Sequence, residues 1–328
     1  MSPAAVSFGQ PLYASAGSPG GVASKPVAGR AWRGASPPRR AARAQLASVG
    51  RTSRSARSAA FVLGTVWLLV VLAPIYYMVL SSFRSQGQYL SANQWLPTGG
   101  LSLSSWSTIF SGSSGLWRDF LNSVIYAAGT VAVVIVLSEL AAFRIVRKGS
   151  RFAGASFRLV LFGLAVPIQA ILIPIYVIMV KLQLYDTLYG LVLATAASQL
   201  AVAVLLTVNY VRMVPRELFD AMAVDGASER TVFWSLVLPM SRPVVGVVSI
   251  FAGLGAWNNF VLPLILTQSN YDAVLPLGLF KISTTASGYG VNVPVVMAGV
   301  VFSVVPLLIL YLALRRQFVK GIGGFALR

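Results

Sequence analysis

The sequence predicts an all-α, polytopic membrane protein with six transmembrane helices. Hydrophobic residues make up 56% of the chain and charged residues only 10%, which is not the balance of a water-soluble domain. Six apolar stretches are each about 20 residues or longer, the length at which a helix crosses a ~30 Å hydrocarbon layer. These stretches cover residues 61–80, 120–143, 157–180, 188–211, 243–266 and 293–314.

Residues 1–58 precede the first span and are rich in Ala, Ser, Gly, Pro and Arg, without a single acidic residue. They have no apolar period, so they are expected to form a disordered basic cytoplasmic tail whose default partner is lipid headgroups. The pair Arg39-Arg40 is compatible with a twin-arginine export signal. The tail interpretation is preferred because the apolar run from Phe61 is long enough to span.

The basic residues fall mainly on one side of the predicted spans. If the N-terminus is cytoplasmic, 22 of the 26 Lys and Arg residues lie in cytoplasmic segments and 4 lie outside. This asymmetry predicts a cell-membrane protein with both termini in the cytoplasm. It also accounts for the net charge of +18 without a nucleic-acid partner. The expected organisation is a tail at 1–58, a six-helix domain at 59–320 and a C-terminal cytoplasmic tail at 321–328.

The residue types present exclude most side-chain catalysis. The chain has no Cys and no His, so it has no disulfide, no Cys or His metal ligand, no thiol nucleophile and no Ser-His-Asp arrangement. None of its five lysines stands in a G-x-x-x-x-G-K-[ST] phosphate loop. We therefore expect no catalytic residue, no metal and no cofactor on this chain.

Polar side chains within the predicted spans are candidates for a transport pathway, because unpaired polar groups are costly in hydrocarbon. Glu139 precedes Arg144 by five residues and is expected to pair with it near the cytoplasmic interface. Gln169 lies between Pro167 and Pro174 and could either line a pathway or hydrogen-bond to another helix. The full set of candidates is Glu139, Gln169, Gln199, Asn209, Asn258 and Asn259.

An acidic segment interrupts the basic cytoplasmic side between the fourth and fifth spans. Glu217, Asp220, Asp225 and Glu229 are four of the eight acids in the chain and fall within thirteen residues. Pro215 near the start of this segment and Gly226 at its end predict a short helix that ends at a glycine in the left-handed conformation.

The spacing in this segment predicts one face containing Leu218, Ala221 and Met222, and another face with Glu217 and Asp220. Downstream, Ser228 can cap a second helix from Glu229 to about Leu238, closed by Pro239. Such a helical elbow is suited to docking a partner. The alternative is an interfacial connector whose acids pair with nearby residues, namely Arg212, Arg216 and Arg230.

The elbow resembles the EAA motif of ABC-importer permeases, in which Glu-Ala-Ala is followed at fixed spacing by Gly and by Ile-x-Leu-Pro. Here Asp220-Ala221-Met222, Gly226 and Leu236 through Pro239 match that spacing, with Asp for Glu, Met for Ala and Leu for Ile. Further stretches resemble the carbohydrate, maltose-permease-like branch, and the likeness covers residues 60–320. These stretches are Asn122-Ser123, Pro167 with Pro174, Leu184-Tyr185-Asp186-Thr187 and Trp257-Asn258-Asn259-Phe260.

The resemblance implies the transmembrane permease subunit of a binding-protein-dependent sugar importer. Its elbow would dock in a groove on a cytoplasmic ABC ATPase dimer, a second homologous permease subunit would complete the pathway, and an extracytoplasmic sugar-binding protein would deliver substrate. Residues 315–321 resemble the start of the family's tail, which reaches into the ATPase dimer. The implied ATPase-coupling residues are Glu217, Asp220, Ala221, Met222, Asp225, Gly226, Leu238 and Pro239.

A sugar carries no charge, so aromatic faces and amide or hydroxyl groups are expected along its path. The candidates are Gln169, Tyr176, Asn258 and Asn259, and the outer segment 267–292 could reach a docked binding protein. Three alternatives remain open: an ABC importer for another small solute, a secondary transporter, and a signalling or scaffold membrane protein. A secondary transporter would need an intramembrane carboxylate or ion site, for which Glu139 is the one weak candidate.

Overall fold

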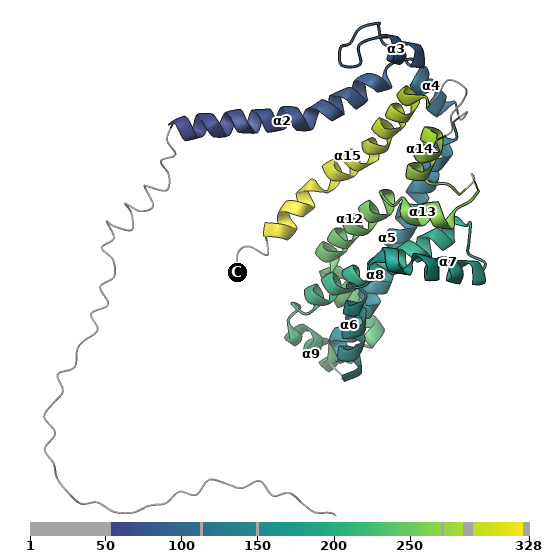
Figure 1. The fold of residues 1–328 in the computed structure, drawn as a ribbon. Helices are drawn as coiled ribbons and strands as arrows, with labels where there is room; N and C mark the ends of the chain where they lie inside the picture. The colour runs from purple at the N-terminus through teal and green to yellow at the C-terminus, as the bar shows by residue number, and fades with distance from the viewer. Residues whose placement is uncertain (1–53, 112–113, 149–150, 270–271, 285–290, 324–328) are drawn as a thin grey trace, which may run out of the picture. The chain divides into compact units, whose positions relative to one another are not determined.

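The computed structural model describes residues 54–111, 114–148, 151–269, 272–284 and 291–323, and within these ranges every regular element is helical (Figure 1). The predicted all-α class is therefore confirmed. The helices are α2 (Arg54–Ser82), α3 (Gln86–Ser91), α4 (Ser104–Phe110), α5 (Leu116–Lys148), α6 (Arg151–Phe162), η1 (Ile168–Ile171), α7 (Leu172–Lys181), α8 (Leu188–Val211), α9 (Arg216–Val224), α10 (Glu229–Val232), η2 (Phe233–Val237), α11 (Leu238–Met240), α12 (Arg242–Trp257), α13 (Val261–Leu266), α14 (Leu275–Thr284) and α15 (Val293–Gly323).

Contacts divide the chain into the units Met1–Thr65 and Val66–Arg328. In the first unit the described part is the beginning of α2, and the rest of the predicted basic tail, including Arg39-Arg40, lies outside the described residues. α2 begins at Arg54, within the segment expected to be the tail. At the other end, α15 continues to Gly323, and the remainder of the predicted tail at 321–328 also lies outside the described residues.

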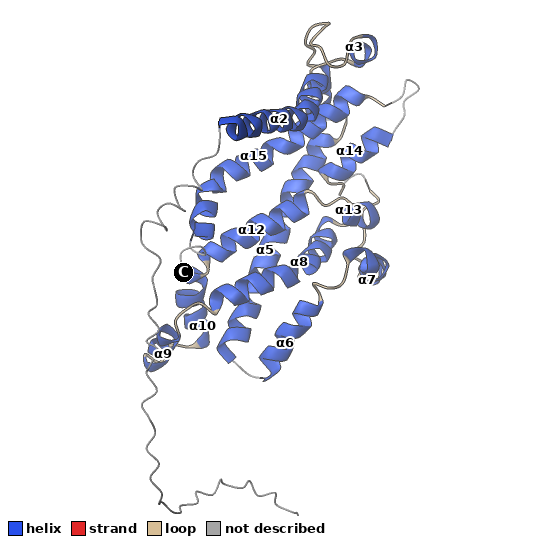
Figure 2. Ribbon diagram, turned by 60° about the vertical axis from the view of Figure 1, so that its left-hand side comes forward, coloured by secondary structure: helices blue, strands red, loops and turns tan. Residues whose placement is uncertain are grey.

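Three helices form the centre of the second unit. α5, α8 and α12 pack against one another, and both views show them running alongside each other (Figure 2). Small and β-branched side chains from all three helices make the middle of this core, among them Val134, Ala203 and Val248. Such side chains allow helices to approach closely, as in other membrane bundles.

Within the described residues, three helices are long and apolar enough to cross a membrane: Ala56–Ser82, Leu116–Arg147 and Leu188–Val211. A fourth crossing is possible if Glu229–Met240 and Arg242–Trp257, bent by 72°, form one span. The stretch 188–211 coincides with α8. The six-span count stays a prediction.

Two predicted spans are interrupted. The stretch 157–180 breaks between the end of α6 at Phe162 and the short 3-10 helix η1, because Pro167 cannot donate a backbone hydrogen bond and holds its neighbours extended. The stretch 243–266 breaks between Trp257, where α12 ends, and Val261, where α13 begins. Asn258, Asn259 and Phe260 thus separate α12 from the short α13.

The outer segment 267–292 contains a helix. α14 packs against α5 and α15, and its residues Leu275 and Leu277 are buried. Asn122 donates its side-chain amide to the carbonyl of Ala273 at 2.9 Å, and the backbone N–H of Leu275 donates to the Ser123 hydroxyl at 2.7 Å. The Asn122-Ser123 pair therefore fixes the start of α14 on α5.

Candidate functional site

The first half of the elbow is a helix with a complete glycine-based end. α9 ends at Val224, Asp225 is its C-cap, and Gly226 follows with a φ of +69°. The N–H of Gly226 donates to the carbonyl of Ala223 at 3.1 Å, and the N–H of Ala227 donates to the carbonyl of Met222 at 2.9 Å. These two bonds satisfy the last carbonyls of the helix in the Schellman arrangement. The predicted left-handed glycine is confirmed.

The second half of the elbow begins as predicted and ends later than predicted. The Ser228 hydroxyl accepts the N–H of Thr231 at 3.2 Å and caps α10. The chain then passes through the π-helical segment η2 and continues in α11 to Met240, so Pro239 does not close the helix. A π-helical turn leaves room for a proline that lacks an N–H. The turn that follows, at Ser241, carries the 72° bend into α12.

Phe219 is the residue of α9 that packs into the bundle. Phe219 is buried and Met222 half-buried against the ends of α5 and α8, whereas Leu218 is 40% exposed and Val224 88% exposed. The predicted apolar face of Leu218, Ala221 and Met222 is therefore largely exposed. Burial of the large Phe219 ring decides the orientation of the helix. The exposed side chains of the elbow include Glu217, Leu218, Asp220, Ala221, Val224 and Asp225.

The elbow is anchored in the bundle by one continuous apolar cluster. Phe219 on α9, Val232 on α10 and Val237 on η2 are buried together with residues of α5 and α8, among them Phe143 and Val208. Phe143 and Phe233 meet edge to face with ring centroids 5.4 Å apart, a geometry that adds about 0.5 to 1.5 kcal/mol beyond burial. The elbow therefore packs directly against the ends of α5 and α8.

Glu139 and Arg144 do not pair. Arg144 instead binds Glu229 on α10, with Nη1 and Oε2 2.7 Å apart, in a pair whose side chains are more than half exposed. Exposed pairs of this kind contribute under about 1 kcal/mol. Glu139 points into the bundle, is 2% exposed and faces the buried Ser241 at the bend. Among the described residues, neither the Glu139 carboxylate nor the Ser241 hydroxyl has a hydrogen-bond partner at normal geometry.

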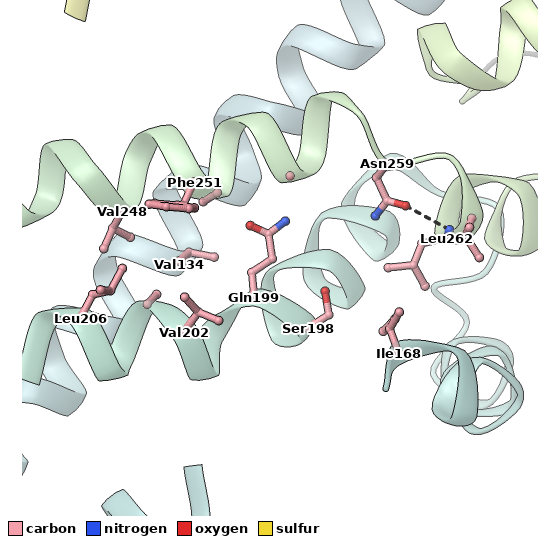
Figure 3. A pocket seen from close by; sticks show the side chains of 14 residues that line it. Val134, Ile168, Ser198, Gln199, Val202, Leu206, Val248, Phe251, Asn259 and Leu262 are labelled. Atoms are coloured by element: carbon pink, nitrogen blue, oxygen red, sulfur yellow. Dashed lines mark hydrogen bonds between the residues drawn. The ribbon is translucent and has the colours of Figure 1, made fainter. Parts of the chain in front are cut away.

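A pocket of about 420 Å³ lies between α8 and α12, close to η1 (Figure 3). Its polar lining comes from Ser198, Gln199 and Asn259, and Phe251 supplies an aromatic face. The Gln199 amide lies against Gly255, where a Cβ would be 3.0 Å from its Nε2. Gly255 thus leaves space for the amide inside the pocket.

The four predicted pathway residues are not brought together. Asn259 lines the pocket, and its Oδ1 accepts the N–H of Leu262 at 3.3 Å. Gln169 is exposed beside Ile168, which does line the pocket, and Asn258 donates to the carbonyl of Leu254 at 2.9 Å. Tyr176 meets the Tyr185 ring edge to face at 5.3 Å.

The sequence places Gln199 among the candidate polar residues of the spans but not in the shorter set for the sugar path, and it does not single out Ser198. Gln199 was one of the polar residues in the predicted spans, but the sequence offered no signal that distinguished it from Asn209. Ser198 lies in the α8 turn that faces the pocket. The relevant signal is the juxtaposition of α8 with Gly255 on α12, which requires the tertiary packing.

The Leu184–Thr187 segment before α8 has a structural role. Asp186, with a φ of +56°, accepts the backbone N–H groups of Gln268 at 2.7 Å and Ser269 at 2.8 Å through Oδ1. Partial burial alone would raise the pKa of Asp186, but the bonds from Ser269 and Gln268, together with the charge of Lys281, lower it below its ordinary value of 3.8. Thr187 caps α8 through the N–H of Gly190 at 3.2 Å.

Comparison with known proteins was made on sequence and on structure. Residues 134–324 match the family model described as "Binding-protein-dependent transport system inner membrane component". A putative ABC transporter permease protein of Caldicellulosiruptor sp. is 32% identical over 268 residues, which cover 82% of this chain and 96% of that protein. An arabinooligosaccharides transport system permease protein of Halalkalibacterium halodurans is 30% identical over 78% of this chain and 91% of that protein.

More distant likenesses point the same way. A diacetylchitobiose uptake system permease protein of Streptomyces coelicolor is 28% identical over 78% of this chain and 84% of that protein. A crystal structure of a bacterial ABC transporter involved in the import of the acidic polysaccharide alginate contains a chain with a TM-score of 0.73 and 20% identity, covering 82% of this chain and 99% of that chain. At 20% identity, the likeness to the alginate transporter chain supports the fold alone. By its matching family model and its relatives, the chain belongs to the family of binding-protein-dependent transport system inner membrane components.

Proposed function

We propose that this chain is the transmembrane permease subunit of an ATP-driven importer for a mono- or oligosaccharide. The single observation that carries the proposal is the helical elbow anchored by Phe219, Val232 and Val237 in the ends of α5 and α8, next to an exposed face that nothing else in the chain covers among the described residues. Relatives named for arabinooligosaccharide, diacetylchitobiose and lactose transport support the sugar assignment.

The proposed partners are a cytoplasmic ABC ATPase dimer, a second homologous permease subunit and an extracytoplasmic sugar-binding protein. ATP hydrolysis belongs to the separate ATPase chain, so this subunit is a transport component without enzyme activity or cofactor. Both termini are placed in the cytoplasm on the basis of the charge asymmetry. A solved alginate transporter in complex with its periplasmic protein, with a TM-score of 0.59 to this chain, shows the same fold.

Coupling follows from the two surfaces of the elbow. Leu218 and Val224 give the outer surface of α9 an apolar contact for the ATPase, flanked by the carboxylates of Glu217 and Asp220. Closing of the ATPase dimer around ATP would move this surface, and the buried cluster would pass the movement to α5 and α8. Alternating access results if the bundle has two packings that this movement biases.

The sugar path is proposed to include the pocket between α8 and α12. Ser198, Gln199 and Asn259 offer hydroxyl and amide groups, and Phe251 offers an apolar face, which together suit an uncharged polyol. Gln169, Tyr176 and Asn258 were also proposed from the sequence, and they remain candidates only for a path that extends beyond this pocket.

The proposal is tested by ATP-dependent sugar uptake into vesicles that contain the chain together with its partner permease, ATPase and binding protein. Asp220→Lys is expected to lower uptake at least tenfold and to reduce recovery of the ATPase, because it reverses a charge on the docking surface. Arg158→Glu is the matched control, since it reverses a charge on the same membrane side but on α6. Normal uptake and ATPase recovery with Asp220→Lys would overturn the coupling role.

The same uptake assay distinguishes two alternative functions from the proposed one. Uptake that follows an ion gradient and persists without ATP would indicate a secondary transporter. Binding of an amino acid or another small solute, instead of a sugar, by the partner binding protein would indicate an importer of a different substrate class.

A further inference from the structure

A second pocket, of about 580 Å³, opens at the cytoplasmic ends of α5 and α8 beside the elbow. Three arginines line it: Arg147 on α5, Arg212 after α8 and Arg216 on α9. Asp220 is the one acidic residue in the lining. The pocket has the volume of a small-molecule site and an excess of positive charge that comes from three different segments.

Two of the three arginines of this pocket lie over aromatic rings, and none of the three forms an ion pair among the described residues. The guanidinium carbon of Arg147 lies 5.9 Å from the centre of the Phe219 ring, and that of Arg212 lies 4.9 Å from the centre of the Phe157 ring. Among the described residues, the ion pair that forms within 4.0 Å is Arg144–Glu229, which lies outside the pocket. Cations gathered in this way repel one another until an anion lies between them.

The level of the pocket in the membrane indicates the kind of anion. Arg147 is the last residue of the apolar span Leu116–Arg147, and Arg212 directly follows the span Leu188–Val211. Ile145, Val146 and Val214 line the same pocket. Guanidinium groups and apolar side chains therefore meet where hydrocarbon gives way to headgroups, which is the environment of a lipid phosphate and its glycerol.

We propose that the pocket lined by Arg147, Arg212 and Arg216 binds the phosphate group of an anionic phospholipid on the cytoplasmic leaflet. Arginine is suited to this role because its planar fork of donors matches phosphate oxygens in pairs. Phe219 forms part of both this pocket and the buried cluster that anchors α9. A lipid in the pocket would thus lie against the Phe219 and Asp220 side of the coupling helix and leave Glu217, Leu218 and Val224 open to the ATPase.

The test uses the complete importer, delipidated in detergent and titrated with phosphatidylglycerol, phosphatidylcholine or soluble glycerol 3-phosphate, with binding followed by native mass spectrometry. Phosphatidylglycerol is expected to bind more tightly than the other two. Arg147→Gln with Arg212→Gln should weaken it by about 25-fold, at roughly fivefold per arginine. Arg216→Gln, on the exposed face of a short helix, should weaken it by about fivefold and does not disturb a span.

The matched control is Arg151→Gln with Arg158→Gln, which removes the same charge from the same side of the membrane but from α6, outside the pocket. It should change phosphatidylglycerol binding by less than about threefold. An equal loss in this control, or equal binding of phosphatidylcholine, would overturn the site. Equal binding of glycerol 3-phosphate would overturn the lipid as its occupant and leave a soluble anion.

The experiment also tests whether the ATPase, instead of a lipid, occupies this pocket. If the chain binds phosphatidylglycerol only without the ATPase and loses it when the ATPase is added, the pocket is an ATPase contact and the proposal fails. Recovery of the ATPase and ATP-driven uptake are measured on every variant, so a failure of the lipid site is distinguishable from a failure of the transport assignment.

Discussion

Gly278 on α14 leaves space for the carboxylate of Asp119 on α5. A Cβ at position 278 would collide with Asp119 Oδ2, and Asp119 is itself only 6% exposed. Gly278→Ala should therefore lower the free energy of unfolding by about 1 to 3 kcal/mol, because a buried side chain has to move. Thermal unfolding in detergent measures this loss.

Gly253→Ala is the control, because its Cβ would meet Val131 Cγ2 at an ordinary 3.5 Å within α12. That substitution is expected to be neutral or slightly stabilising, since Ala favours a helix over Gly. Equal unfolding temperatures for the two variants would contradict the close approach of α14 and α5.

The hydrogen bonds of Asp186 to Gln268 and Ser269 should make the stability of the folded chain depend on pH in the acidic range. Because its folded pKa lies below its ordinary value of 3.8, its contribution is fully present above pH 3.8 and is lost as the pH falls through the lower folded pKa. Asp186→Asn should therefore lower the unfolding temperature at neutral pH, and the difference from the wild type should shrink as the pH falls below 3.8. Thermal unfolding followed over this pH range checks it.

The pKa of Asp272, in the same segment 267–292, is shifted in the opposite direction to that of Asp186. Burial and then the charge of Asp186 raise the pKa of Asp272, so its ionised form opposes folding above that pKa. Asp272→Asn should slightly raise the unfolding temperature at neutral pH. A loss of stability in both variants would show that the amide geometry, and not the charge, governs this loop.

Glu139 illustrates which residue contacts a sequence can and cannot reveal. The expected pair with Arg144 joined two residues five apart, whose side chains point in clearly different directions on a helix; neighbours on one face are three or four apart. The contact with Ser241 links residues 102 positions apart in the sequence. No local pattern contains that information.

At the level of elements, the glycine turn of the elbow makes the sharpest prediction. Gly226→Val places a β-branched residue at a φ of +69°, where the added Cβ meets nothing within 4 Å, so the effect is one of backbone strain alone. A local cost of about 1 to 2 kcal/mol should change the direction of α10 relative to α9. Sugar uptake and ATPase recovery should both fall, with normal membrane levels.

Gly154→Val is the matched control for this variant. Gly154 lies on α6, a Cβ there also meets nothing within 4 Å, and its φ is in the ordinary range. It should retain uptake within about twofold. If Gly226→Val transports as well as Gly154→Val, the direction of the elbow does not matter for coupling.

The elements that the sequence predicted well are those with strong local signals. α8 has the predicted bounds, and Gly226 and Ser228 stand where helix-end chemistry places them. The break after Phe162 lies just before Pro167, a residue that the sequence does show, whereas the π-helical turn before Pro239 was missed because hydropathy does not register backbone geometry. Which apolar residue of α9 is buried is not visible in the sequence, because Leu218 and Phe219 are neighbours and only packing against α5 and α8 selects Phe219.

For the molecule as a whole, the charge asymmetry predicts a definite topology. Reporter fusions after Pro215 should report the cytoplasm, and fusions after Gly99 should report the outside, because 22 of the 26 basic residues then lie on the cytoplasmic side. Fusions are read by two reporters of opposite compartment preference. A cytoplasmic signal after Gly99 would overturn the assigned orientation.

The cluster that unites Phe219, Val232 and Val237 with α5 and α8 has a mechanical consequence. A load applied at α9 has two routes into the bundle: through the cluster to the ends of α5 and α8, and along the chain past the bend at Ser241 into α12. Because α12 itself packs on α5 and α8, both routes lead to the helices that enclose the pocket with Gln199 and Asn259.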